Sequence, residues 1–389
     1  MSTITPPQEQ KPGHRFHKTG RMNSDLFMRI GAAAGAWVIL LMLVALISVV
    51  TAAAIPSIRA YGAHFLFSSE WQPNRLPILK LGPNGKPIKN HGRNRFTEPW
   101  VIARDASGQP MYTPERLGAL APVVGTIQSS IIGLIVAVPL SLGAAIFLVR
   151  LAPRRLKGPV SFLIEFLAAI PSIAYGLWGM FVLQPWLGGP PRWFGKIPTG
   201  GMEAHLRDWF GNWPGLHWIF YTTGANGNEA AISLTGRDIF CGGLVLGIMI
   251  VPIITAISRD VLANVPRAQI EGAIALGATW WQSCKEMLKY SRSGLFGGIM
   301  LGLARASGET MAVLMVMGST VEIAKSPFQG GTTMSALIAS LYSEAATDEI
   351  QRGALMEIAL ILLAMSLLFN VAARYLVVGG ASSRTAMAV

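Results

Sequence analysis

Six long runs of apolar residues alternate with polar segments along this chain. A helix needs about twenty residues to cross roughly 30 Å of hydrocarbon, and each run meets that length. The pattern therefore predicts six transmembrane helices, near residues 28–55, 121–149, 160–187, 239–262, 294–318 and 353–378. The first run is too long for the apolar core of a cleaved signal peptide, so we expect it to remain as an anchor.

The composition agrees with a membrane protein. Hydrophobic residues make up 51% of the 389 positions and charged residues only 13%, with a mean hydropathy of +0.45. We therefore expect an all-α integral membrane protein with a basic tail over 1–27, a six-helix domain over 28–378 and a short tail over 379–389. The net charge of +12 does not indicate nucleic acid, because the basic residues flank apolar runs instead of forming a stripe interleaved with aromatics.

Basic residues gather in three short flanks and predict the orientation in the membrane. Cytoplasmic loops are enriched in Lys and Arg, whereas long loops cross the membrane largely regardless of charge. We therefore discount the nine Lys and Arg of the long loop 56–120 and place both termini in the cytoplasm. The basic residues that carry this prediction are Lys11, Arg15, Lys18, Arg21, Arg29, Arg150, Arg154, Arg155, Lys157, Arg259, Arg267, Lys285, Lys289 and Arg292.

Two outer segments, 73–116 and 188–238, interrupt the apolar pattern. The first is rich in Gly, Pro and Asn, which predicts turns and short strands. The second has four tryptophans among polar neighbours, as is typical of the membrane interface: Trp193, Trp209, Trp213 and Trp218. Neither segment holds a catalytic constellation of residues. Cys241 and Cys284 fall near opposite faces of the predicted bilayer, so no disulfide is expected between them.

The fifth predicted helix combines a close-packing face with two charges. Small residues recur at every fourth position and would let another helix approach at backbone distance: Gly294, Gly298, Gly302 and Ala306. Arg305 and Glu309 lie beside this stripe, about one helical turn apart. A continuous helix would therefore direct both charges to the same side.

Ionisable residues within a spanning helix are costly and indicate a functional pathway. The planar guanidinium of Arg305 can hold an oxyanion through two hydrogen bonds and keeps its charge, which suits a phosphate-like anion better than a proton relay. Glu309 would weaken anion binding enough for release, and would pair with Arg305 when the path is empty. The alternative is a structural ion pair that joins two helices. Glu165 and Glu357 are further candidates, each equally consistent with a position near the membrane surface.

The polar connection 259–292 predicts a helix, a turn and a second, short helix. Pro266 is placed to start the first helix, Gly277 ends its apolar periodicity, and Thr279 is placed to cap the second. The same pattern is equally consistent with an amphipathic hairpin that rests on lipid headgroups. The Gly-Lys pairs of the chain lack the Ser or Thr that a P-loop requires, so an ATP-driven transporter would need a separate ATPase.

Two stretches of this sequence resemble a known family. Glu271-Gly-Ala-Ile-Ala-Leu-Gly277-Ala-Thr-Trp280 is similar to the EAA loop of ABC importer permeases, which docks on the ATPase. Gly297-Gly-Ile-Met-Leu-Gly-Leu-Ala-Arg-Ala-Ser-Gly-Glu-Thr-Met-Ala-Val313 resembles the phosphate permeases of the PstC type. Residues 167–179 and 354–358 agree with the same family, so the resemblance extends over nearly all the predicted helices.

The resemblance implies a type I ABC importer (MetI-like) permease fold with six transmembrane helices, which forms half of a phosphate path and is not itself an enzyme. Its implied partners are a PstA-type permease, a PstB-type ATPase dimer that binds ATP and Mg, a PstS-type binding protein, phosphate and the lipids of a bacterial inner membrane. No cofactor is implied in this chain. The implied ATPase-coupling residues are Glu271, Gly272, Ala273 and Gly277. The implied substrate-path residues are Arg305, Glu309, Thr310 and Glu357.

The sequence departs from the family pattern in three places. Lys289-Tyr290 stands where the loop motif usually closes with Leu-Pro, Ser319 stands where Asn is common, and the two outer segments look like insertions. Other functions are an importer of a related oxyanion, an ion-coupled secondary transporter in which Glu309 and Glu357 would titrate, and a membrane scaffold or sensor. A secondary transporter would be expected to show inverted repeats, which the chain does not display.

Overall fold

The computed structural model describes residues 22–73, 115–188, 201–211, 213, 216–223, 229–232 and 235–385. Most of the predicted basic tail, most of the first outer segment and Trp193 of the second lie outside these residues. The chain divides into two units, Met1–Ala52 and Ala53–Val389. The first contains most of helix α1 (Met22–Tyr61), and the second contains all the other elements.

The second unit is almost entirely helical, and its β1–β2 hairpin pairs Tyr221 with Ala231 in antiparallel register. Its elements in chain order are α2 (His64–Phe67), α3 (Leu120–Ile146), η1 (Phe147–Leu151), α4 (Arg154–Ala169), α5 (Ser172–Trp178), η2 (Gly179–Leu183), α6 (Gln184–Gly188), α7 (Met202–Phe210), α8 (His217–Phe220), β1 (Tyr221–Thr223), β2 (Glu229–Ala231), α9 (Ile239–Ala263), α10 (Arg267–Ala275), α11 (Trp280–Ser307), α12 (Met311–Val316), α13 (Met334–Leu341), η4 (Ala345–Thr347) and α14 (Glu349–Thr385).

Within the described part of the chain, four helices are long and apolar enough to cross a membrane. They correspond to the first, second, fourth and sixth predicted runs, and they confirm an all-α membrane protein. Their bounds are Met28–Tyr61, Leu120–Leu151, Ile239–Ala263 and Glu349–Ala372. The prediction of six spans is not confirmed, because the third and fifth predicted runs are not single straight helices.

The third predicted run bends by 90° between Arg154–Ala169 and Ser172–Gly188. Pro171 explains the bend, because proline disfavours a helical conformation in the residue before it and lacks the N–H that a helix needs. Ile170 accordingly has an extended backbone, with φ −66° and ψ 130°. Counting this pair as one broken span would bring the total to five.

The fifth predicted run, 294–318, differs more strongly from the prediction. Helix α11 already begins at Trp280, so the predicted second short helix and the first part of this run form one helix of 28 residues. Lys289-Tyr290 replaces the Leu-Pro of the family motif, and without that proline nothing interrupts the helix. The helix then ends at Ser307, and a separate short helix, α12, follows at Met311.

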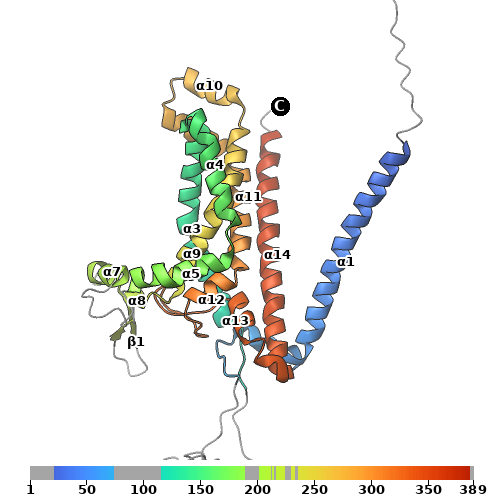
Figure 1. Cartoon of the computed structure of the whole chain (residues 1–389), viewed down its shortest axis with the longest axis vertical. Coiled ribbons are helices and arrows are strands. Elements are labelled where there is room, and N and C mark those ends of the chain that lie inside the picture. The colour runs from blue at the N-terminus through green and yellow to red at the C-terminus, as the bar shows by residue number, and fades with distance from the viewer. Residues whose placement is uncertain are drawn as a thin grey trace, which may run out of the picture. The chain divides into compact units, whose positions relative to one another are not determined.

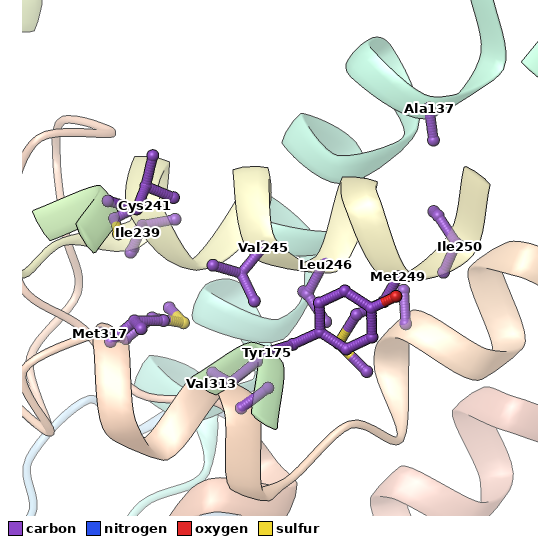
Figure 2. Packing of buried hydrophobic residues seen from close by; sticks show 14 of the residues in the cluster. Ala137, Tyr175, Ile239, Cys241, Val245, Leu246, Met249, Ile250, Val313 and Met317 are labelled. Atoms are coloured by element: carbon purple, nitrogen blue, oxygen red, sulfur yellow. The ribbon is translucent and has the colours of Figure 1, made fainter. Parts of the chain in front are cut away.

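Helix α9 is the centre of the packing. Its glycines allow close contact with α3, since a Cβ at Gly133 would lie 3.2 Å from the carbonyl oxygen of Gly243. Figure 2 shows Tyr175, from α5, lying between α9 and the α12 residue Val313, in a cluster of buried apolar side chains that includes Val245. Within the second unit, α10 and the C-terminal end of α14 lie at one end, whereas α7 and α8 lie toward the other (Figure 1).

Candidate translocation and coupling sites

The small-residue stripe of α11 packs directly against α9, as its spacing predicts. A Cβ at Gly294 would lie 2.7 Å from Val261, and a Cβ at Gly302 would lie 2.8 Å from Ile254. Both distances are shorter than ordinary van der Waals contact, so a larger residue at either position would force the α9 side chain to shift. The contact fixes α11 against the central helix and thereby positions the residues at its C-terminal end.

A break in the helix follows at Gly308–Thr310. One of its backbone groups has a remote partner: the Ser335 hydroxyl, at the start of α13, donates to the Glu309 carbonyl at 2.6 Å. The Glu309 N–H instead donates locally, to the Ala306 carbonyl at 3.3 Å. On the other side, α12 approaches α5 closely, because a Cβ at Gly176 would lie 3.0 Å from Ala312 Cα. Two remote segments therefore support the break, which the apolar pattern alone did not indicate.

Arg305 and Glu309 do not share a helical face. Arg305 is exposed in the last turn of α11, whereas Glu309 lies beyond the helix end and is 8% exposed. The ion pairs found among the described residues do not include one between them, so the predicted pairing in an empty path is not seen in this chain. A structural ion pair is therefore a poor explanation for their presence. The negative end of the α11 dipole favours a cation at Arg305.

The other predicted path residues lie in different surroundings. Thr310 is half-buried at the break, and its hydroxyl donates to the Gly308 carbonyl at 3.4 Å. Glu357, on α14, is buried and accepts a hydrogen bond at 2.7 Å from the Ser57 hydroxyl. Its hydrogen-bond partner is thus in the C-terminal part of α1, in the second unit, and not Arg305.

Glu165 pairs with Arg259 at 3.0 Å, and the Glu165 side chain is exposed. This ion pair joins α4 to α9. The position fits the surface alternative given for Glu165 by the sequence, and it argues against a role in a central path.

The predicted first helix, turn and Thr279 cap are confirmed at α10 and the start of α11, whereas the second helix is long and not short. Gly277 has φ +84°, a left-handed conformation that glycine adopts without steric strain. The Thr279 hydroxyl accepts from the Gln282 N–H at 3.3 Å, and the Gln282 side chain accepts from the Thr279 N–H at 2.7 Å. This reciprocal capping box starts α11.

No residue of helix α10 is buried, and all but the half-buried Ile270 and Ala273 are exposed. Glu271 and Gly272 are exposed, and Leu276, just after the helix, is 91% exposed. Ala273 and Ile270 line a hollow of about 340 Å³ that α11 closes from the other side. An exposed helix with free apolar side chains is suited to contact with a partner protein.

Sequence reasoning missed a buried pair of carboxyl groups, Glu203 on α7 and Asp238 at the start of α9. Both are essentially inaccessible to solvent. Glu203 accepts from the Gly236 N–H at 3.3 Å, and Asp238 caps α9 by accepting from the Cys241 N–H at 2.8 Å. Each keeps a second oxygen buried without an N–H or hydroxyl donor, so a proton shared between the two carboxyl groups is needed to satisfy them.

Burial, together with the neighbouring Asp238 carboxylate, raises the pKa of Glu203 to about 9. Burial also raises the pKa of Asp238. The pair fastens α7, in the second outer segment, to the N-terminus of α9. Only three-dimensional proximity reveals it, because the two residues lie far apart in the sequence and neither belongs to a recognisable motif.

The chain belongs to the family of binding-protein-dependent transport system inner membrane components, whose model matches residues 121–378. This membership defines a membrane permease, not an enzyme.

Among similar proteins is the phosphate transport system permease protein PstC of Pasteurella multocida, 43% identical over 64% of this chain and 71% of that protein. PstC of Xylella fastidiosa strain 9a5c is 33% identical over 96% of both chains. PstC 2 of Mycobacterium tuberculosis is 34% identical over 92% of both. A chain of the MetNI methionine ABC transporter in an inward-facing conformation matches with a TM-score of 0.41 and 16% identity, over 66% of this chain and 91% of that one.

Proposed function

We propose that this chain is the permease subunit of an ATP-driven importer of inorganic phosphate and forms half of the translocation path. The relatives named above, similar over up to 96% of the chain, support phosphate as the substrate. The observation within the chain that carries the proposal is the exposed Arg305, which has no carboxylate partner among the described residues. An unpaired guanidinium within an apolar segment needs an anion, and phosphate fits its two parallel donors.

Arg305 and Glu309 would have opposite effects on the passing anion. The guanidinium binds phosphate through charge-assisted hydrogen bonds from its planar set of N–H donors. The buried Glu309 carboxylate, at the adjacent helix break, lowers the affinity of the site. A path must bind its ion weakly enough to release it, so this opposition favours transport over tight binding. Thr310, next to Glu309, would supply a hydroxyl to the path. Glu357 would contribute to the path from α14, where it is hydrogen-bonded to Ser57.

Energy would come from a separate ATPase that docks on α10. Glu271, Gly272, Ala273 and Gly277 shape this exposed hairpin, and its free apolar side chains support the assignment. We propose a PstB-type ATPase dimer that holds ATP and Mg, a PstA-type sister permease and a PstS-type phosphate-binding protein as partners.

We further propose an inner-membrane location with both termini in the cytoplasm. The C-terminal end of α14 lies at the same end of the second unit as α10, which supports a cytoplasmic C-terminus if α10 meets the ATPase (Figure 1).

The decisive test is phosphate uptake by cells or proteoliposomes that carry Arg305→Gln in the assembled transporter. We expect uptake to fall below about 1% of wild type while assembly is retained, because the neutral amide cannot supply the charge-assisted interaction. Arg305→Lys should recover only part of the rate, since it keeps the charge but loses the planar fork.

Arg292→Gln is the matched control, because Arg292 is also an exposed arginine on α11. It should leave uptake near the wild-type rate. Near-normal uptake by Arg305→Gln, normalised to assembled complex, would overturn the proposed path role of Arg305.

A further inference from the structure

A cavity of about 390 Å³ lies beside the start of α10, and four cationic side chains are among the residues that line it. Arg150 comes from η1, Lys157 from α4, Arg259 from α9 and Arg267 from α10. The only acidic side chain among the lining residues is that of Asp260. Four separate elements thus contribute one positive charge each to the same hollow.

Most of this charge has no carboxylate partner in the part of the chain that the structure describes. Arg259 is the exception, because it pairs with both Glu165 and Asp260 at 3.0 Å. No carboxylate of the described residues lies within 4 Å of the other three cations.

The three remaining cations have at most neutral partners within the described chain. The Arg150 guanidinium contacts the Ser283 hydroxyl at 3.3 Å, and the Lys157 ammonium contacts the Val149 carbonyl at 3.3 Å. Arg150 is half-buried and held by this contact, whereas Lys157 and Arg267 are exposed at the rim. The hollow therefore has a fixed guanidinium at its wall and two adjustable cations at its mouth, an arrangement suited to a multivalent anion.

We infer that this cavity binds a phosphate group. A phosphate offers several oxygens to donors that converge from different directions, whereas a single carboxylate would satisfy only part of the charge. The site is separate from the proposed path: Met287, which lines the cavity, lies eighteen residues before Arg305 on α11, or roughly 27 Å along the helix axis.

An anionic phospholipid is the source that the surroundings favour. Phe162 and Phe166, on the α4 helix that supplies Lys157, are both exposed and stack on each other with ring centroids 6.3 Å apart. Acyl chains could lie along this apolar surface while the headgroup phosphate enters the cavity. Basic pockets between membrane helices bind anionic lipid headgroups in this manner. Free inorganic phosphate offers the same chemistry without the acyl chains.

The test uses the assembled transporter in nanodiscs and a variant with both rim charges removed, Lys157→Gln with Arg267→Gln. The matched control is Arg154→Gln with Arg155→Gln, two exposed arginines of the same basic stretch that do not line the cavity. Phosphatidylglycerol retained by each protein is measured by mass spectrometry after exchange into phosphatidylcholine. We expect about 25-fold weaker retention by the rim variant and little change in the control, since each basic residue near an anionic headgroup contributes about fivefold.

A second arm tests free phosphate in phosphatidylcholine nanodiscs. The thermal midpoint is compared in sodium phosphate and in sodium chloride of equal ionic strength. Stabilisation that persists in Arg305→Gln and is lost in the rim variant would support the cavity with free phosphate as its ligand. Equal lipid retention by all proteins, together with no phosphate stabilisation dependent on Lys157 and Arg267, would overturn the inference.

Discussion

The two interruptions on either side of α11 are held in different ways. The turn before it, at Gly277, uses a left-handed glycine with φ +84° and the Thr279 capping box, all within six residues. The break after it, at Gly308, has φ −92°, an ordinary value, and its support comes from Ser335 and from the close approach of α5. The first is encoded locally and lies in solvent, whereas the second depends on distant parts of the chain. A local interruption can therefore serve as a rigid docking point, while a remote one can change when its partners move.

The start of α9 is held both by a local cap, Asp238, and by a remote residue, Glu203. The largest expected effect on stability is at this pair. In the folded protein Glu203 has a pKa of about 9 and keeps its proton at neutral pH. In the unfolded chain its pKa is the ordinary 4.5, so the proton is released at any higher pH. The folded state binds more protons, so stability falls as pH rises from about 4.5 to about 9. At pH 7 the cost is roughly 3 kcal/mol. We expect Glu203→Gln to remove the part of the pH-dependent loss of stability that comes from Glu203, and so to raise the thermal midpoint at pH 7 relative to wild type.

The measurement is the thermal midpoint of the solubilised complex between about pH 5 and about pH 8. Asp208→Asn is the control, because Asp208 is an exposed carboxylate on the same helix, α7. It should keep the wild-type pH dependence. If the Glu203→Gln curve ran parallel to that of wild type, a shared proton at this pair would be excluded.

The second prediction removes the remote support of the break. Ser335→Ala deletes the hydroxyl that donates to the Glu309 carbonyl, leaving a buried acceptor without this donor. Such a loss destabilises by about 1 to 3 kcal/mol. Ser340→Ala is the control on the same helix, since its hydroxyl donates to the Leu337 carbonyl within α13 and supports no other element among the described residues. Thermal unfolding should separate the two variants, and equal midpoints would mean that the break does not depend on Ser335.

The third prediction alters the local turn. Gly277→Val places a β-branched residue at φ +84°, which costs about 1 to 2 kcal/mol. We expect this to displace α10 and to reduce the ATPase retained during co-purification by about tenfold, with the chain still present in the membrane. Gly277→Asn should retain most of the ATPase, because asparagine tolerates the left-handed region. Equal retention by Val and Asn variants would show that the turn geometry does not control docking.

The smallest effect is expected at Ser319, where the chain departs from the family pattern. Ser319 has φ +56°, a left-handed conformation that asparagine adopts more readily than serine. This provides a physical reason for the common asparagine. Ser319→Asn should stabilise the protein by about 0.5 kcal/mol, a fraction of the roughly 1 to 2 kcal/mol that the left-handed region costs an ordinary residue. A lowered thermal midpoint would indicate that the serine hydroxyl has a role that geometry does not reveal.

The sequence was informative where structure depends on neighbouring residues. Pro266, Gly277 and Thr279 predicted the hairpin correctly, and the spacing of the small residues predicted the face that α11 presents to a neighbouring helix. The bend at Pro171 had a local signal as well, because an Ile-Pro step within an apolar run disfavours a continuous helix.

The remaining features depend on long-range contacts that no window of sequence contains. The break at Gly308 lies in an apolar run with no turn signal strong enough to end it, and its hydroxyl donor lies 26 residues away from Glu309. The Glu203 and Asp238 pair is formed by tertiary packing alone. For the same reason the expected pairing of Arg305 with Glu309 failed: four residues make one turn only if the helix continues.

The pairing of Gln72 with Arg116 has a further consequence for how such chains vary. These residues form two backbone hydrogen bonds, of 2.7 and 3.2 Å, and Arg116 also pairs with Glu70 at 3.0 Å. The intervening segment therefore leaves and re-enters the helical framework at one point. Doubling the number of residues between two ends that are joined in this way costs only about 0.6 kcal/mol of closure entropy. Changes in the number of residues between Gln72 and Arg116 should therefore be tolerated during evolution, and the paired ends offer a site for grafting a reporter domain without moving the helices.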